Sequence, residues 1–205
     1  MSDFVYRAEV GFAEQRSYLE ERAARVTLPG MTEQHHMFFD ASRCIGCFGC
    51  EVHCKLERDV PVGPRLCRMI QVGPAVVAGK LQTDWVYMSC FHCEDAPCMA
   101  VCPTSAMRKR ADGIVWVDEP ACIGCKACLQ ACPWGAVQFN PRDNKVIKCD
   151  YCKDRVDQGL WPACATKCST KALFFGTLNE WTTMRRERHA RRNMAGPLGS
   201  SERGA

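Results

Sequence analysis

Cysteine is the residue type in this chain whose number and spacing could support chemistry, since 17 of the 205 residues are cysteines. Sixteen of them fall into four groups that each open with C-x2-C and close with C-x3-C, around a middle gap of 2, 4, 2 or 11 residues. The groups are Cys44, Cys47, Cys50 and Cys54; Cys90, Cys93, Cys98 and Cys102; Cys122, Cys125, Cys128 and Cys132; and Cys149, Cys152, Cys164 and Cys168. Clustered thiolates bind metal ions and iron–sulfur clusters, so the spacing predicts metal centres.

The run from Cys122 to Cys132, with a proline after its last cysteine, has the spacing of bacterial two-cluster ferredoxins. There, three cysteines of the run bind one 4Fe–4S cluster and the fourth binds the other cluster. A structural zinc site uses two separated C-x2-C pairs, so binding zinc would leave one cysteine of each run without a role. We therefore expect four 4Fe–4S clusters, with a structural zinc-binding protein as a much weaker interpretation.

A disulfide framework fits this chain poorly, because the spacings crowd thiols together and Cys67 leaves an odd count. The first fifteen residues show neither an apolar segment nor a twin-arginine pair, so we expect no export signal and a cytoplasmic location. No apolar run reaches the roughly 18 residues of a membrane span, and none is expected. Reduced thiols are the consistent interpretation.

Exchange of the fourth cysteine between groups can be arranged in two ways. Groups two and three are adjacent in sequence, so they should exchange Cys102 and Cys132, which leaves groups one and four to exchange Cys54 and Cys168. The alternative pairs group one with two and group three with four, and spacing alone leaves both arrangements open.

The segments between the cysteines predict short secondary structure of an α+β, loop-rich fold. Alternating residues flank turn sequences at 111–113 and 140–144, which predicts two β-hairpins. A further strand is expected within 171–176, and one or two helical turns within 126–132. After the last cysteine of groups two, three and four an alanine recurs at the fourth place, which indicates a repeated module.

Residues 36–178 resemble the electron-transfer iron–sulfur subunits of the dimethyl sulfoxide reductase family. The resemblance is carried by CFHCEDAPCMAVCPTSAM, by CIGCKACLQACPWGAV and by KCDYCKDRV, and all four cysteine motifs stand in family order. One departure is Ser169, which follows Cys168 where a proline is usual. The resemblance implies two ferredoxin-like modules that each hold two 4Fe–4S clusters, with the four clusters in a line.

The resemblance supports the pairing of group one with four and of two with three. It implies the ligand sets Cys44, Cys47, Cys50 and Cys168; Cys54, Cys149, Cys152 and Cys164; Cys90, Cys93, Cys98 and Cys132; and Cys102, Cys122, Cys125 and Cys128. One module would comprise residues 37–89 and 145–178, and the other residues 90–144. Residues 1–36 would be an arm that docks on a partner, and residues 179–205 a basic tail.

The function that the resemblance implies is single-electron transfer without substrate chemistry in this chain, where no nucleophile with an oriented base is recognisable. The partners would be a large molybdopterin or tungstopterin catalytic subunit and an integral-membrane, quinone-reactive subunit. Export together with a twin-arginine partner would instead place the complex in the periplasm. The alternative function is service to a hydrogenase or carbon monoxide dehydrogenase.

Nucleic acid is not an expected partner, because bound clusters change the charge balance. With sixteen thiolates and four cationic cores, the formal charge of +4 would become about −4. The basic cluster from Arg185 to Arg192 would face anionic lipid, an acidic partner or solvent.

The remaining candidates are assigned to packing and tuning. Cys67 is expected to be a buried core thiol, His53 and His92 to pack or hydrogen bond near sulfide, and Trp134 to pack beside a cluster. Basic residues that could tune cluster potentials are Lys109, Arg110, Lys126, Lys148, Lys153 and Arg155.

Overall fold

Short helices and two-stranded sheets carry the cysteines in the computed structural model, which describes residues 34–198. The helices are α2 (Gly49–Glu57), α3 (Pro97–Ala100), α4 (Ala127–Ala131), α5 (Lys153–Val156), α6 (Ala163–Thr166) and α7 (Leu178–Leu198), with a 3-10 turn η1 (Ala41–Arg43). The strands are β1 (His36–Phe39), β2 (Arg68–Val77), β3 (Lys80–Met88), β4 (Met107–Lys109), β5 (Val115–Val117), β6 (Val137–Asn140), β7 (Lys145–Lys148) and β8 (Leu173–Gly176). The expected α+β, loop-rich class is confirmed.

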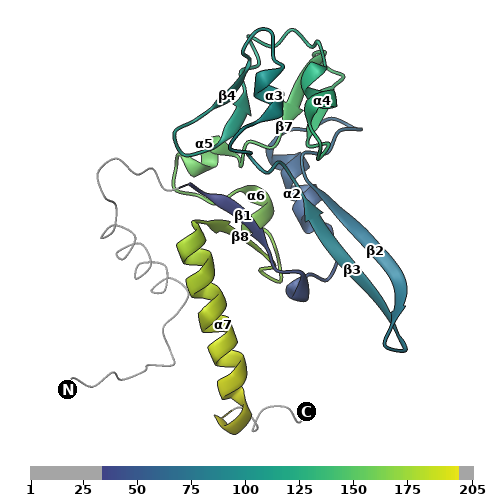
Figure 1. The fold of residues 1–205 in the computed structure, drawn as a ribbon, viewed down its shortest axis with the longest axis vertical. Helices are drawn as coiled ribbons and strands as arrows, with labels where there is room; N and C mark the ends of the chain where they lie inside the picture. The colour runs from purple at the N-terminus through teal and green to yellow at the C-terminus, as the bar shows by residue number, and fades with distance from the viewer. Residues whose placement is uncertain (1–33, 199–205) are drawn as a thin grey trace, which may run out of the picture. The chain divides into compact units, whose positions relative to one another are not determined.

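All strands of the described residues pair antiparallel in two-stranded sheets. The hairpins β4–β5 and β6–β7 lie at the two predicted turns, and β8 and α4 lie where a strand and helical turns were expected. The sequence did not predict the long hairpin β2–β3, nor the pairing of β1 with β8, which joins His36 to Gly176. Figure 1 shows β1 and β8 side by side although they lie at opposite ends of the cysteine-rich region.

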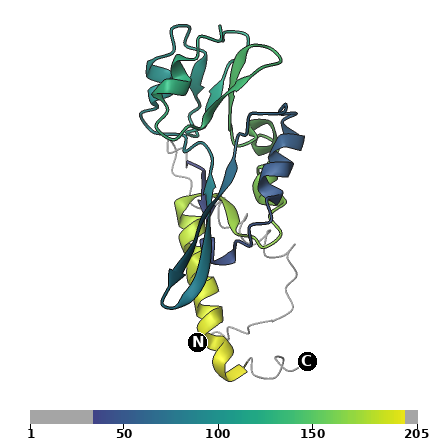
Figure 2. The ribbon, with the colours of Figure 1, turned by 90° about the vertical axis from the view of Figure 1, so that its right-hand side faces the viewer.

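The described residues form two hydrophobic cores. The first core surrounds the helix pair α2 and α6 and includes Leu66, Met69, Tyr87 and Phe175. The second surrounds the pair α3 and α4 together with the hairpins β4–β5 and β6–β7. Figures 1 and 2 show the helices and strands of the second core at one end of this part of the chain.

The two cores meet through β7 and the loop before β5. Strand β7 pairs with β6, and its Val146 packs in the second core, past the boundary expected at residue 144. Ile114, which is fully buried, packs in the first core although it lies between β4 and β5. Packed side chains therefore link the first core to the second.

Helix α7 begins at a capping box. The Thr177 amide donates to the Glu180 carboxylate at 2.8 Å, and the Glu180 amide donates to the Thr177 hydroxyl at 3.2 Å. Arg188 lies 3.4 Å from the buried carboxylate of Asp40, so part of the expected basic cluster faces an acid of this chain. The expected docking arm lies outside the described residues except for 34–36, and so does the end of the basic tail.

Candidate metal centres

Two cavities of the second core are each lined by four cysteines, and each set mixes two groups. Site 3 consists of Cys90, Cys93, Cys98 and Cys132, which line one small cavity. Site 4 consists of Cys102, Cys122, Cys125 and Cys128, which line another. In both sites three cysteines come from one group and the fourth from the other. The structure thus brings together the thiols of an exchanged pair, groups two and three.

Groups one and four meet in the first core through the packing of α2 against α6. Burial is the main reason that the pKa of Cys50 rises to about 12, and the nearby Cys168 contributes to the rise. Burial likewise raises the pKa of Cys164 to about 12, with contributions from Cys54 and Cys152. The eight remaining motif cysteines form two candidate sets, which we call site 1 and site 2. Site 1 is Cys44, Cys47, Cys50 and Cys168, and site 2 is Cys54, Cys149, Cys152 and Cys164.

The opening loop of every group contains a left-handed residue just before its second cysteine. These residues are Gly46 (φ 66°), His92 (φ 48°), Gly124 (φ 70°) and Tyr151 (φ 53°). The Gly46 amide donates to the Cys44 sulfur at 3.5 Å, and the His92 amide donates to the Cys90 sulfur at 3.4 Å. Loops that turn their amides inward in this way form anion-binding nests, which are common around iron–sulfur clusters.

The alanine that recurs four residues after the last cysteine of groups two, three and four has a structural reason; we call these four residues the tail of each group. Each tail places a left-handed residue before its alanine: Ser105, Gly135 and Lys171. The Ala136 amide then donates to the Cys132 sulfur at 3.4 Å, and the Ala172 amide donates to the Cys168 sulfur at 3.2 Å. The repeated alanine therefore follows a turn that returns an amide to the exchanged cysteine.

Gly124 gives a test of this loop geometry. A Cβ at this position would overlap the Asn144 carbonyl and would require a left-handed alanine. Gly124→Ala should therefore lower the free energy of unfolding by about 3 kcal/mol, from backbone strain and overpacking. Anaerobic urea unfolding of the loaded protein measures this change.

The matched control is Gly135→Ala, because Gly135 is also left-handed (φ 63°) but a Cβ there meets nothing within 4 Å. Its cost should be about 1 kcal/mol, from the backbone alone. Equal costs for the two variants would contradict the tight contact at Gly124.

Tyr87 is a site residue that the sequence did not predict. Its buried hydroxyl lies 3.4 Å from the Cys164 sulfur, and burial, reinforced by Cys164, raises the Tyr87 pKa well above its ordinary value. The hydroxyl therefore stays protonated and donates a hydrogen bond to the Cys164 sulfur. The one signal in the sequence is its position three residues before Cys90 at the end of an alternating stretch.

Tyr87→Phe should lower the reduction potential of site 2 alone. A hydrogen bond to a ligand sulfur favours the more negative, reduced state. A hydrogen bond to a charged group contributes roughly 1.5–3 kcal/mol, and only part of this energy differs between the oxidised and the reduced cluster. The ratio of reduced to oxidised cluster at site 2 should therefore fall about threefold at fixed potential. An EPR-monitored redox titration measures this ratio.

Tyr151→Phe is the matched control for this change. It removes another buried hydroxyl, which is hydrogen bonded by the Met37 backbone and not by sulfur. A shift of equal size in Tyr151→Phe would show that lost hydroxyls act through general packing.

Three other predicted candidates lie beside these sites. Cys67 is a buried core thiol, as predicted, and lies within hydrogen-bonding reach of Cys54. The His92 ring accepts a hydrogen bond from the Val115 amide at 2.9 Å and contacts the Tyr151 ring at a centroid distance of 3.7 Å. Its Nε2 is buried and has no hydrogen-bond partner among residues 34–198. His53 is half-buried on α2.

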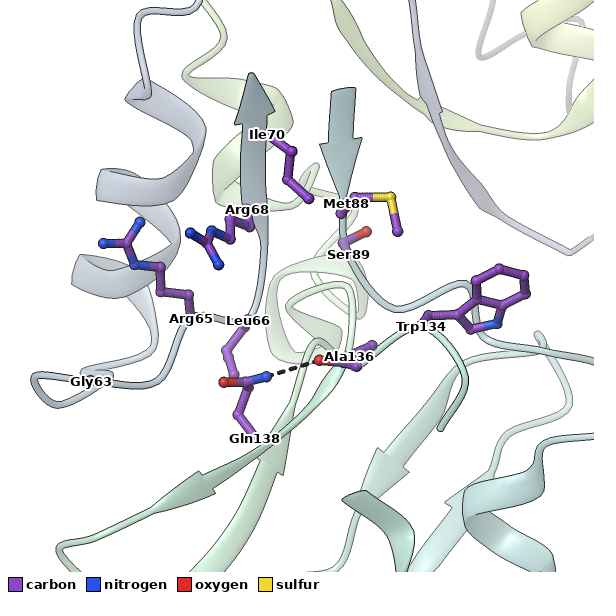
Figure 3. Close-up of a pocket in the computed structure, with 11 residues that line it drawn as sticks. Gly63, Arg65, Leu66, Arg68, Ile70, Met88, Ser89, Trp134, Ala136 and Gln138 are labelled. Carbon is purple, nitrogen blue, oxygen red and sulfur yellow. Dashed lines mark hydrogen bonds between the residues drawn. The ribbon is translucent and has the colours of Figure 1, made fainter. Parts of the chain in front are cut away.

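Trp134 packs at the edge of site 3. It lines that cavity, and its ring centroid lies 5.1 Å from that of Phe91. The indole is 53% exposed, and Figure 3 shows it bordering an open groove with Arg65 and Arg68 on the opposite side. The predicted packing role of Trp134 is consistent with this position.

The basic candidates differ in their surroundings. Lys109 pairs with Glu94 at 2.7 Å, Arg110 with Asp157 at 2.6 Å, and Arg155 with Glu57 at 3.3 Å. Lys126 is exposed and lines the cavity of site 4, while Lys153 pairs with Asp154 at 2.6 Å. Lys148 is the buried member of this set.

The donor set fits iron–sulfur clusters. Each of the two cavities presents four sulfur ligands around a space, and in site 3 the His92 and Ala136 amides donate to two of these sulfurs. No group of three or more His, Cys, Asp or Glu side chains in the described part of the chain is close enough to hold a single metal ion. In the same part, no helix is long and apolar enough to cross a membrane.

Comparison with known proteins agrees with this donor set. Residues 82–178 match the model of a 4Fe–4S dicluster domain. The sequence is 42% identical over 161 residues to the B subunit of anaerobic dimethyl sulfoxide reductase from Escherichia coli strain K12, covering 73% of this protein and 77% of the relative. It is 43% identical to the thiosulfate reductase electron transfer subunit of Salmonella typhi, covering 73% of this protein and 79% of that relative.

A third relative, the B subunit of polysulfide reductase from Wolinella succinogenes, is 38% identical over 152 residues, covering 73% of this protein and 80% of the relative. The cofactors are therefore 4Fe–4S clusters, and the sixteen motif cysteines are sufficient ligands for four. The resemblance found in the sequence is confirmed, and the chain belongs to the family of electron-transfer iron–sulfur subunits that includes the B subunit of dimethyl sulfoxide reductase.

Proposed function

We propose that sites 1 to 4 each bind one 4Fe–4S cluster through the four cysteines assigned to them above. The cavities of sites 3 and 4 support this assignment, because each is lined by three cysteines of one group and the last cysteine of the other. The charge of Cys168 raises the pKa of Cys50, and that of Cys54 raises the pKa of Cys164, and this proximity supports the same exchange in the first core.

The two cores correspond to two modules of two sites each. We assign sites 1 and 2 to a module formed by residues 37–89 and 149–178, and sites 3 and 4 to residues 90–148. The boundary follows Lys148, because β7 pairs with β6 and packs Val146 in the second core. Residue Cys90 of site 3 packs against the first core, which brings site 3 next to site 2.

Bound 4Fe–4S clusters supply one-electron transfer. The chain holds the sites in the order 1, 2, 3 and 4, and exposes the two at the ends. Cys47 of site 1 and Cys125 of site 4 are exposed, and the same two opening loops carry Ile45 and Ile123, each 66% exposed. The buried thiols of site 2 exclude water from the middle of the path. Electrons would therefore enter and leave through the loops of sites 1 and 4.

The proposed partners are those of a reductase complex. The relatives are named as subunits of dimethyl sulfoxide, thiosulfate and polysulfide reductases. We assign to this chain a large molybdopterin or tungstopterin catalytic subunit at one end and a membrane-embedded, quinone-reactive subunit at the other. The chain would then be attached to a membrane through its partner. Cell fractionation shows whether the complex faces the cytoplasm or the periplasm.

Anaerobic native purification tests this function. Mass spectrometry of the bound proteins and metal analysis should find molybdenum or tungsten in a large partner, together with iron and acid-labile sulfide in this chain. Nickel in the partner would contradict the proposal and indicate a hydrogenase or carbon monoxide dehydrogenase. Iron-loaded protein without a large partner would indicate a free electron carrier.

A further inference from the structure

Lys148, at the end of β7, is a buried cation between two groups of thiols. Its side chain is only 4% exposed. The ammonium donates one hydrogen bond to the Val115 carbonyl and another, at 2.7 Å, to the Cys149 carbonyl. Lysine has three donors, so these two bonds leave one N–H for the surrounding space.

No carboxylate among the described residues balances this buried charge. Three of the acids that line the adjoining groove with Lys148 have other partners: Asp150 pairs with Arg58 at 2.9 Å, Asp118 with Arg108 at 2.6 Å, and Asp154 with Lys153 at 2.6 Å, and Lys148 forms no ion pair within the described residues. A buried ammonium without a counter-ion is costly. The anion that offsets this cost must therefore be something other than an acidic side chain of this region.

The position of Lys148 identifies two sources of negative charge. Its side chain lines the cavity of site 3 together with Cys98, and its backbone continues directly into Cys149 of site 2. Cys90 of site 3 packs against the same core as Cys149. Lys148 therefore lies where sites 2 and 3 meet, with sulfur ligands of both nearby.

We propose that Lys148 is the shared counter-cation of sites 2 and 3, and that it raises the reduction potential of both. This inference rests on the proposed function, because the balancing charge is that of the bound clusters and their thiolates. Each added electron makes a site more negative, so a fixed cation in a water-poor environment favours the reduced form. Lys148 acts as a positioning residue that eases electron transfer across the junction between the modules.

Lys126 provides a natural comparison. It lines the cavity of site 4, as Lys148 lines that of site 3, but its side chain is exposed and its ammonium lies 4.1 Å from the Phe139 ring centroid. Water and salt screen such a charge. A lysine beside a site should therefore have a large effect only when it is buried.

The test is an EPR-monitored redox titration of the purified complex carrying Lys148→Met or Lys148→Gln, with Lys126→Met as the control. The signals of sites 2 and 3 are identified by their loss in Cys152→Ala and Cys93→Ala. At fixed potential, the ratio of reduced to oxidised cluster should fall about tenfold at both sites in each Lys148 variant, equivalent to about 59 mV for one electron. Sites 1 and 4 should change less than threefold, and so should every site in Lys126→Met.

Unchanged potentials at sites 2 and 3 in fully loaded Lys148→Gln protein would overturn the inference. A shift at only one of these sites would overturn the assignment to both. Loss of iron from either site in both variants would show that Lys148 serves only to hold the strands. If the unmodified chain contains no 4Fe–4S clusters, the proposed function itself fails, which is a separate result visible before any variant is made.

Discussion

Replacing Cys132 with alanine should remove the cluster of site 3 and leave that of site 4 in place. Cys132 follows three ligands of site 4 within one run of sequence, yet it lines the cavity of Cys90, Cys93 and Cys98. The Ala136 amide donates to its sulfur and holds it toward that cavity. Iron should fall from about sixteen to about twelve atoms per chain, and electron transfer between the ends of the chain should be lost.

EPR of the reduced protein with iron and sulfide analysis measures this outcome. The matched variant Cys128→Ala, in the same run, should instead remove the cluster of site 4, because Cys128 lines only that cavity. Cys67→Ala should leave iron content unchanged, since Cys67 belongs to no proposed ligand set. Loss of site 4 in Cys132→Ala, with site 3 retained, would contradict the exchange of ligands.

The local features of the fold could be read from the sequence because they depend on neighbouring residues. Each opening loop needs two cysteines three apart with a residue between them that tolerates positive φ, and glycine fills this place at Gly46 and Gly124. The hairpins β4–β5 and β6–β7 follow turn residues between alternating strands. Such signals lie within a few residues of the structure that they specify.

Features that depend on distant residues could not be read in this way. Strand β1 pairs with β8 across more than a hundred residues, and nothing in the four residues of either strand identifies the other. Tyr87 reaches Cys164 only because β3 and α6 contribute to the same first core. Lys148 was one of several lysines near cysteines, and only the folded chain separates it as the buried one.

The choice between the two exchange arrangements shows the same limit. Spacing allowed group one to pair with either group two or group four, because both open with C-x2-C and close with C-x3-C. The packing of α2 against α6, and of α3 against α4, supports the pairing of group one with group four and of group two with group three. Helix packing therefore supplies the information that the motif lacks.

Removing iron and sulfide from the purified chain should unfold most of residues 34–176. Outside α2, the helices before α7 have only four or five residues, and most strands have three or four, lengths at which isolated elements are not stable in water. The two cores also contain cysteines of all four groups, so emptied sites would leave cavities at their centres.

The charges lead to the same expectation. Without bound clusters Lys148 is a buried cation with no anion among the described residues to balance it, whereas the buried thiols Cys50 and Cys164 have pKa values of about 12 and are neutral at pH 7. The thiols therefore cannot replace the negative charge of a bound cluster. Structural metal sites contribute on the order of 10 kcal/mol to folding, which is comparable to the whole stability of a domain.

Chelation under reducing, anaerobic conditions, followed by far-UV circular dichroism and limited proteolysis, measures the outcome. The strand signal should be lost, and proteases should cut within 34–176 at many positions. Restoring iron and sulfide should recover both the signal and the resistance to proteolysis. A chain that keeps its circular dichroism spectrum and a cooperative urea transition after complete iron removal would contradict this account, because its cores would then be stable without the clusters.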